Sequence, residues 1–71
     1  MSASIRDIQT LGLAIRKRRK QAHIRIDDAA ALCGISVSTL SAIENGSRPA
    51  RIDKILHVIN KLGMSLQLGD E

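Results

Sequence analysis

The absence of aromatic residues limits most strongly what this chain can fold into. None of its 71 residues is Phe, Tyr or Trp, although 44% of them are apolar. The core must therefore be built from smaller aliphatic side chains, which bury less area apiece than aromatic ones. A chain of this length forms one small domain and buries only about 60% of its unfolded surface. We expect a single copy to be marginally stable, and oligomerisation to supplement its core.

Cysteine, histidine and charge narrow the class of protein further. The single cysteine, Cys33, cannot form an internal disulfide, and His23 and His57 lack partners at metal-ligand spacing. No catalytic arrangement can be read from the sequence, so we expect neither an enzyme nor a bound metal or cofactor. The 11 Lys and Arg outnumber the 7 Asp and Glu, and the net charge of +4 favours an anionic partner. Without a membrane-spanning run or a signal-like start, the chain is expected to be cytoplasmic.

Apolar residues at spacings of three and four predict four short helices. The first covers residues 8–22 and the fourth residues 52–62, and each has an apolar face. Two shorter helices, over residues 27–33 and 37–45, lie between them, and the earlier one is dominated by alanine. In the fourth helix the apolar spacing is carried by Ile52, Ile55, Leu56 and Ile59. The sequence therefore predicts an all-α fold of four short helices.

The C-terminal tail follows a different pattern. Apolar and polar residues alternate with a period of two, as in a half-buried β-strand, over Met64, Ser65, Leu66, Gln67 and Leu68. Because the chain offers no partner strand, we expect the same strand of a second copy to pair with it across a twofold axis. The alternative is a frayed coil whose apolar residues lie against the helices.

The two middle helices and the turn between them form a helix-turn-helix pair. A helix of small residues is followed by the turn Gly34-Ile35-Ser36 and by a helix with a polar outer face. Such a pair places the start of its second helix in the major groove of DNA. The pattern is not specific by itself, because many helical bundles contain a glycine-bounded turn. We expect an N-terminal segment over residues 1–7, a DNA-binding domain over residues 8–63, and a dimerisation strand and tail over residues 64–71.

A set of spaced motifs resembles a known family. The motifs are Gly12-x-x-Ile15-x-x-x-Arg19, Ala30-x-x-x-Gly34-Ile35-Ser36, Thr39-Leu40-Ser41-x-Ile43-Glu44-Asn45-Gly46 and Leu62-Gly63. Together they resemble the Xre/lambdoid phage-repressor helix-turn-helix domain, with its lambda-repressor-like fold. The tail directly after the fourth helix is similar to that of HipB-type antitoxins, in which the tail strands of two protomers pair. The resemblance implies a homodimeric repressor of its own operon, bound to an inverted-repeat operator in double-stranded DNA, and a toxin partner of the HipA kinase class.

The resemblance also implies roles for individual residues. Arg19 and Glu44 would join the first helix to the end of the third through a two-pronged ion pair. Base contacts are implied for Ser36, Val37, Ser38, Thr39 and Ala42. DNA backbone contacts are implied for Arg25, Ser41, Asn45, Ser47 and Arg48. Because Ser and Thr discriminate poorly between bases, we expect DNA shape to carry part of the specificity.

The chain departs from the family pattern at the starts of two helices. Arg25-Ile26 stands where the family often has Thr-Gln, so we expect Ile26 to pack and Arg25 to supply any phosphate contact. Arg51 stands where a capping Ser or Thr is common, so we expect a weak cap or one supplied by Asp53.

The basic run and the small base-contacting residues do not by themselves establish DNA binding. The basic residues 16–20 point all around a helix, so we expect most of them to be solvated rather than to form one nucleic-acid surface. The weak base readers also permit a protein-interaction adaptor that has kept the fold. A stand-alone repressor without a toxin is the other alternative.

Overall fold

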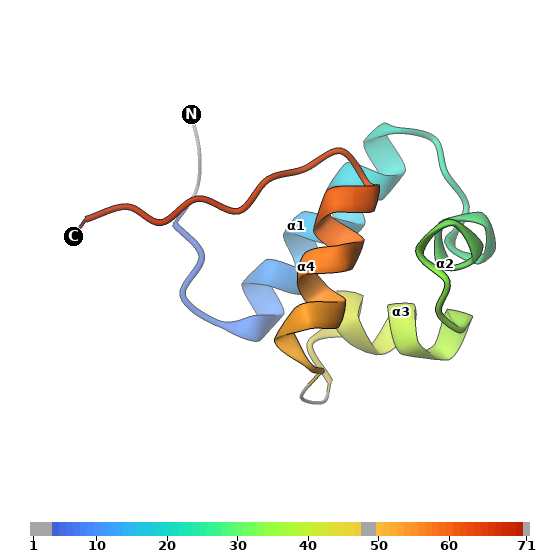
Figure 1. Cartoon of the computed structure of the whole chain (residues 1–71), viewed down its shortest axis with the longest axis horizontal. Helices are drawn as coiled ribbons and strands as arrows, with labels where there is room; N and C mark the ends of the chain where they lie inside the picture. The colour runs from blue at the N-terminus through green and yellow to red at the C-terminus, as the bar shows by residue number, and fades with distance from the viewer. Residues whose placement is uncertain (1–3, 48–49, 71) are drawn as a thin grey trace.

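The computed structural model describes residues 4–47 and 50–70, which form four helices. These are α1 over Ile8–Gln21, α2 over Ile26–Cys33, α3 over Val37–Asn45 and α4 over Ile52–Lys61. The prediction of four helices is confirmed, and each helix end lies within one residue of its predicted position. Figure 1 shows α4 crossing in front of α1, with α2 and α3 on one side of this pair and the C-terminal tail leaving on the other.

Side chains and left-handed residues mark where the helices begin and end. Asp7 and Ser36 accept hydrogen bonds from the backbone amides three residues later, at 2.7 and 3.0 Å, and so cap α1 and α3. Gly34 and Gly46 end α2 and α3 at φ values of 70° and 60°, which glycine adopts without steric cost. The turn after α1 instead contains His23 at φ 58°, a conformation that is strained for a residue with a Cβ atom.

The same tripeptide, Arg-Ile-Asp, opens both α2 and α4. Arg25 and Arg51 are the N-cap residues, and neither makes a side-chain cap hydrogen bond. Each arginine instead lies 3.3 Å from the aspartate two residues later, Asp27 or Asp53. The carboxylate of Asp53 also accepts from the adjacent amide of Lys54 at 3.0 Å. The first amides of α2 are therefore left open to solvent or to a ligand, whereas Asp53 partly satisfies those of α4.

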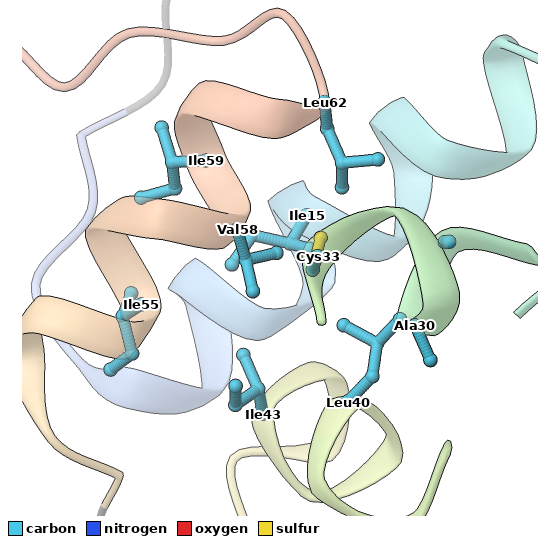
Figure 2. Close-up of a cluster of buried hydrophobic side chains, with 10 residues drawn as sticks. Ile15, Ala30, Cys33, Leu40, Ile43, Ile55, Val58, Ile59 and Leu62 are labelled. Carbon is cyan, nitrogen blue, oxygen red and sulfur yellow. The ribbon is translucent and has the colours of Figure 1, made fainter. Parts of the chain in front are cut away.

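The core is aliphatic and lies where the four helices meet. Ile15 of α1, Leu40 and Ile43 of α3 and Val58 of α4 are its largest fully buried side chains. Figure 2 shows side chains of all four helices converging on this region, including Cys33 of α2. Each large aliphatic side chain contributes about 1.5–3 kcal/mol when it is fully buried. The core is thus continuous but small.

Helices α1 and α3 touch backbone to backbone. An ideal Cβ atom added to Gly12 of α1 would lie 2.5 Å from the carbonyl oxygen of Glu44 and closer still to that of Ile43. No side chain fits in this space. Gly12 therefore fixes how closely α1 and α3 approach each other.

The buried face of α4 differs from the apolar spacing read in the sequence. Ile55 and Ile59 are buried, but Ile52 is 62% exposed and Leu56 is 37% exposed. Val58 and Leu62 complete the buried face instead, which therefore consists of Ile55, Val58, Ile59 and Leu62. The physical reason is that the described part of a single copy packs against one side of α4 and leaves its other apolar flank uncovered.

The tail forms no regular secondary structure over residues 64–70, the part of it that the structure describes. Met64 packs against the core, whereas Leu66 is 46% exposed and Leu68 is 97% exposed. A strand exists only where a second backbone pairs with it, and the described residues of one copy form no such pairing. Pairing of the tails across a homodimer therefore stays a prediction.

Candidate nucleic-acid interface

The helix pair α2–α3 has the geometry of a helix-turn-helix. The two helices meet at 105°, within the range of about 90–120° that such pairs adopt. The turn is closed by a hydrogen bond of 3.0 Å from the amide of Ile35 to the carbonyl of Ala30. Ala29 and Ala30 are 0% and 2% exposed, and their small side chains let a neighbouring helix approach α2 closely. Local sequence thus sets the angle at which α3 is presented.

A buried ion pair holds this unit against α1. Arg19 donates from Nε to Glu44 at 2.7 Å and from a terminal nitrogen to the other carboxylate oxygen at 3.0 Å. The guanidinium also donates to the carbonyl of Ile24 at 3.0 Å. The hydrogen bond with Glu44 raises the pKa of Arg19, although burial opposes this shift. One side chain therefore ties α1 to the end of α3 and to the loop before α2.

The start of α3 presents small side chains to solvent. Ser36, Val37 and Ser38 are exposed, and Thr39 and Ala42 are half-buried. The Ser36 hydroxyl accepts from the amide of Thr39 at 3.0 Å and donates to the Thr39 hydroxyl at 2.8 Å. The Ser36 hydroxyl is engaged in capping α3, so Val37 and Ser38 are the exposed predicted base-contacting residues whose side chains have no such role.

The predicted backbone-contacting residues fall into two places. Arg25 stands at the start of α2 with its side chain 81% exposed. The second group lies along the second half of α3 and directly after it, and consists of Ser41, Asn45 and Ser47. The Asn45 side-chain amide donates to the Ser41 hydroxyl at 3.4 Å. The remaining residue, Arg48, lies outside the residues that the structure describes.

Two further cations lie beside α3. A hollow between α3 and the start of α4 is lined by Arg51 and Lys54 together with Ser38, Thr39, Ala42, Ile43 and Ala50. The sequence predicts only a weak cap at Arg51 and gives Lys54 no role. The missed signal is a pair of basic residues in the first turn of the helix that follows α3. A phosphate near α3 would lie within the field of both cations.

The basic residues 16–20 do not form one surface. Arg19 is buried in its ion pair, and Arg18 donates from Nε to the carbonyl of Leu62 at 3.2 Å, at the end of α4. Arg16, Lys17 and Lys20 are exposed. These three residues therefore contribute positive charge to the solvated surface of α1.

Neither cysteine nor histidine forms a reactive centre. Cys33 is buried, and burial raises the pKa of its thiol, so the thiol stays protonated. His57 lies 3.0 Å from the carbonyl of Cys33 and links α4 to α2. Among the described residues, no group of three or more His, Cys, Asp or Glu could hold a metal ion.

Helices α2 and α3 meet at 105°, and α3 is capped by Ser36 and exposes its first turn. These features define a helix-turn-helix protein. The chain belongs to the HTH_3 helix-turn-helix family, of the Xre/lambdoid type, whose model matches residues 15–68. It is 29% identical over 68 residues to y4mF, an uncharacterized HTH-type transcriptional regulator of Sinorhizobium fredii (strain NBRC 101917 / NGR234). The match covers 96% of this chain and 90% of that relative.

Solved structures of HipB share the fold. A HipA-HipB-O2-O3 complex contains a chain with a TM-score of 0.88 and 23% identity, and the match covers 97% of each chain. A HipB variant in complex with an O2 20mer gives a TM-score of 0.89 at 23% identity, covering 99% of this chain and 97% of that one. The predicted resemblance to HipB is thus confirmed at the level of the fold.

Fold and family together define the general function. The chain is a DNA-binding helix-turn-helix transcriptional regulator and not an enzyme. In the described part of the chain, no helix alone is long and apolar enough to cross a membrane; only α2 and α3 taken together, across their bend, meet the length and composition required.

Proposed function

We propose that the protein is a homodimeric repressor that inserts the start of α3 into the major groove at each half of an inverted repeat. The observation that carries the proposal is the 105° angle between α2 and α3, together with the exposed first turn of α3. This geometry lets α3 enter a groove while α2 crosses the DNA backbone. Two copies would read half-sites about 34–36 Å apart, or a multiple of that distance.

Base reading is assigned to Ser36, Val37, Ser38, Thr39 and Ala42. Val37 and Ala42 can contact only a thymine methyl group, and hydroxyls accept or donate to several bases. The commitment of Ser36 to the cap of α3 weakens direct reading further. Specificity therefore depends in part on the shape and deformability of the operator.

Backbone contacts are assigned to Arg25, Ser41, Asn45, Ser47 and Arg48, and to the open amides at the start of α2. The exposed guanidinium of Arg25 supports this role, since the nearby Asp27 is 3.3 Å away and leaves most of it in solvent. These groups position α3 without reading sequence.

The antitoxin role is the finer part of the proposal. It is supported by the similarity of this fold to HipB in a complex that also contains HipA. The protein would bind and neutralise a kinase toxin and repress the operon that encodes both. The tails of two copies, over Met64, Ser65, Leu66, Gln67 and Leu68, would pair to hold the dimer, which would join the nucleoid when bound to its operator.

Gel-shift titration against the DNA upstream of the gene tests the DNA-binding function. Ser38→Glu places a negative charge at the start of α3, and Gln21→Glu places the same charge at the exposed end of α1. We expect Ser38→Glu to weaken binding by about tenfold or more, and Gln21→Glu to change it little. Affinity should also fall with salt, with a log–log slope of about −0.9 per phosphate contacted. Binding without sequence preference or salt dependence would favour the protein-interaction adaptor.

The neighbouring reading frame tests the antitoxin role. We expect a kinase-like protein whose expression alone arrests growth, whose toxicity this protein suppresses, and which co-purifies with it. A DNA-binding dimer that neither binds nor suppresses the neighbouring product would be a stand-alone repressor instead.

A further inference from the structure

One exposed leucine of α1 stands among cations. Leu13 is 61% exposed in the middle of α1, and a shallow hollow around it is lined by Arg16, Lys17, Lys20 and Gln21. These four residues follow Leu13 at spacings of three, four, seven and eight, so all five share one side of the helix. We call Leu13, Arg16, Lys17 and Lys20 the α1 face. An apolar centre and a cationic rim therefore belong to one surface.

The α1 face points away from α4. Successive residues of an α-helix are turned by about 100°, so Leu13 and Lys20 lie nearly opposite Arg18 around the axis of α1. Arg18 marks the side of α4, because its Nε donates to the carbonyl of Leu62 at the end of that helix. Gly12 marks the side of α3, whose backbone it touches. The described elements thus leave a third side of α1 uncovered.

The cations of the α1 face are not neutralised within the described part of the chain. Helix α1 contains no Asp or Glu, and no carboxylate of the described residues pairs with Arg16, Lys17 or Lys20. Lys20 lies three residues after Lys17 and four after Arg16, spacings at which like charges destabilise a helix. The helix dipole favours Lys20 in the last turn, but its effect falls off before Arg16 and Lys17. A partner that brings carboxylates would remove this repulsion.

The chemistry of the α1 face selects among possible occupants. A phosphate backbone would bind the cations but would leave Leu13 without an apolar contact. A second copy would bring the same three positive charges against the first. An acidic protein segment that presents an apolar side chain between carboxylates matches both the centre and the rim, as protein interfaces with an apolar core and a polar rim do.

We infer that the α1 face binds an acidic segment of the partner protein, with an apolar side chain on Leu13 and carboxylates beside the three cations. This inference rests on the proposed antitoxin role, since the partner is the product of the neighbouring reading frame, and it adds the surface at which that product docks. Helix α1 touches α3 at Glu44, near the end of α3, whereas base contacts are assigned to its start. The partner and DNA can therefore be bound at once.

Titration calorimetry of the full chain with the purified product of the neighbouring reading frame tests the inference. Leu13→Gln removes the apolar centre without changing the charge. Leu32→Gln is its control, because it makes the same change at a leucine that is 51% exposed on α2. We expect Leu13→Gln to raise the dissociation constant by about tenfold or more, and Leu32→Gln to leave it unchanged. Lys17→Glu should raise it by a similar factor, and by less at about 1 M salt, where charges are screened within about 3 Å.

The outcomes separate this inference from the proposed function. If the product binds the wild type but Leu13→Gln and Leu32→Gln behave alike, the antitoxin role stands and docking on the α1 face is refuted. If the wild type binds operator DNA but not the product, the antitoxin role fails and the docking fails with it.

Operator binding and helical content provide the controls. In gel shifts, Leu13→Gln should bind the operator as the wild type does. If it loses operator binding and keeps partner binding, the α1 face belongs to DNA and the inference is overturned. Far-UV circular dichroism checks that the variants keep the helical content of the wild type. Should Leu13→Gln lose helical content, Lys17→Glu replaces it, with the same outcomes.

Discussion

Replacing Glu44 with glutamine should destabilise this protein far more than its small chemical change suggests. Glu44→Gln keeps the size of the side chain but removes its charge and replaces one acceptor oxygen with an amide NH2 group, which donates. The Arg19 guanidinium then faces a donor where it now has an acceptor at 2.7 or 3.0 Å. The charge of Arg19 stays buried, because its side chain is only 9% exposed.

The expected loss is large compared with the stability of a domain of this size. Removing one partner of a buried ion pair costs about 3–5 kcal/mol. At about 0.05–0.15 kcal/mol per residue, a 71-residue chain has a total stability of about 4–11 kcal/mol. The substitution should therefore remove about a quarter or more of the total and leave part of the population unfolded.

Urea denaturation measures this loss, and an exposed pair provides the control. Arg25 and Asp27 also pair, at 3.3 Å, but their side chains are 81% and 55% exposed. Asp27→Asn should cost less than about 1 kcal/mol, since exposed pairs contribute little. The wild type and both variants are compared at one protein concentration, because dimerisation makes the unfolding midpoint depend on concentration.

Two results would show that the reasoning about the pair is wrong. The first is a midpoint for Glu44→Gln that shifts no further than that of Asp27→Asn. The second comes from replacing both Arg19 and Glu44 with methionine. That double variant removes both charges together and should recover much of the lost stability. If it is as unstable as Glu44→Gln, the loss comes from packing and not from an uncompensated charge.

Three further predictions concern the helices themselves. Gly12→Ala should destabilise the protein by about 1–3 kcal/mol, because a methyl group has no room between α1 and α3, whereas Gly69→Ala, in open space, should leave the urea midpoint unchanged. His23→Gly should raise stability by about 0.5–1 kcal/mol, measured the same way, by relieving the left-handed strain. Hydrogen bonds from Thr10 lower the pKa of Asp7 below its ordinary value of 3.8. The Asp7 cap should therefore stabilise the protein above about pH 3.8 and lose its effect as the pH falls through the lower folded-state pKa; the melting temperatures of wild type and Asp7→Ala should converge there.

Short-range signals explain why so much of the fold could be read from the sequence. Asp7 and Ser36 cap helices through amides only three residues away, and Gly34 and Gly46 end helices through their own backbone freedom. Such signals depend on neighbours along the chain, so they survive in a single sequence. The helix-turn-helix was predictable for the same reason, because its turn and both of its helix ends are local.

Long-range packing explains what could not be read. Spacing alone marked Ile52 and Leu56 as apolar positions of α4, but it could not say which side of α4 the rest of the chain would cover. Lys54 lines the hollow beside α3 because the start of α4 lies next to α3, a contact that spacing along the chain does not reveal. Arg18, expected to be solvated, reaches the carbonyl of Leu62 across 44 residues of sequence.

The sequence by itself determined the helices, their ends and the class of protein, since each depends on contacts within a few residues or on motifs of fixed spacing. The tertiary structure decided which apolar residues are covered and which remain exposed. It also placed Gly12 where α1 and α3 touch and gave Arg19 its three hydrogen bonds. Both outcomes follow from how helices cross in space, because burial is a property of the surfaces that meet and not of the residues alone.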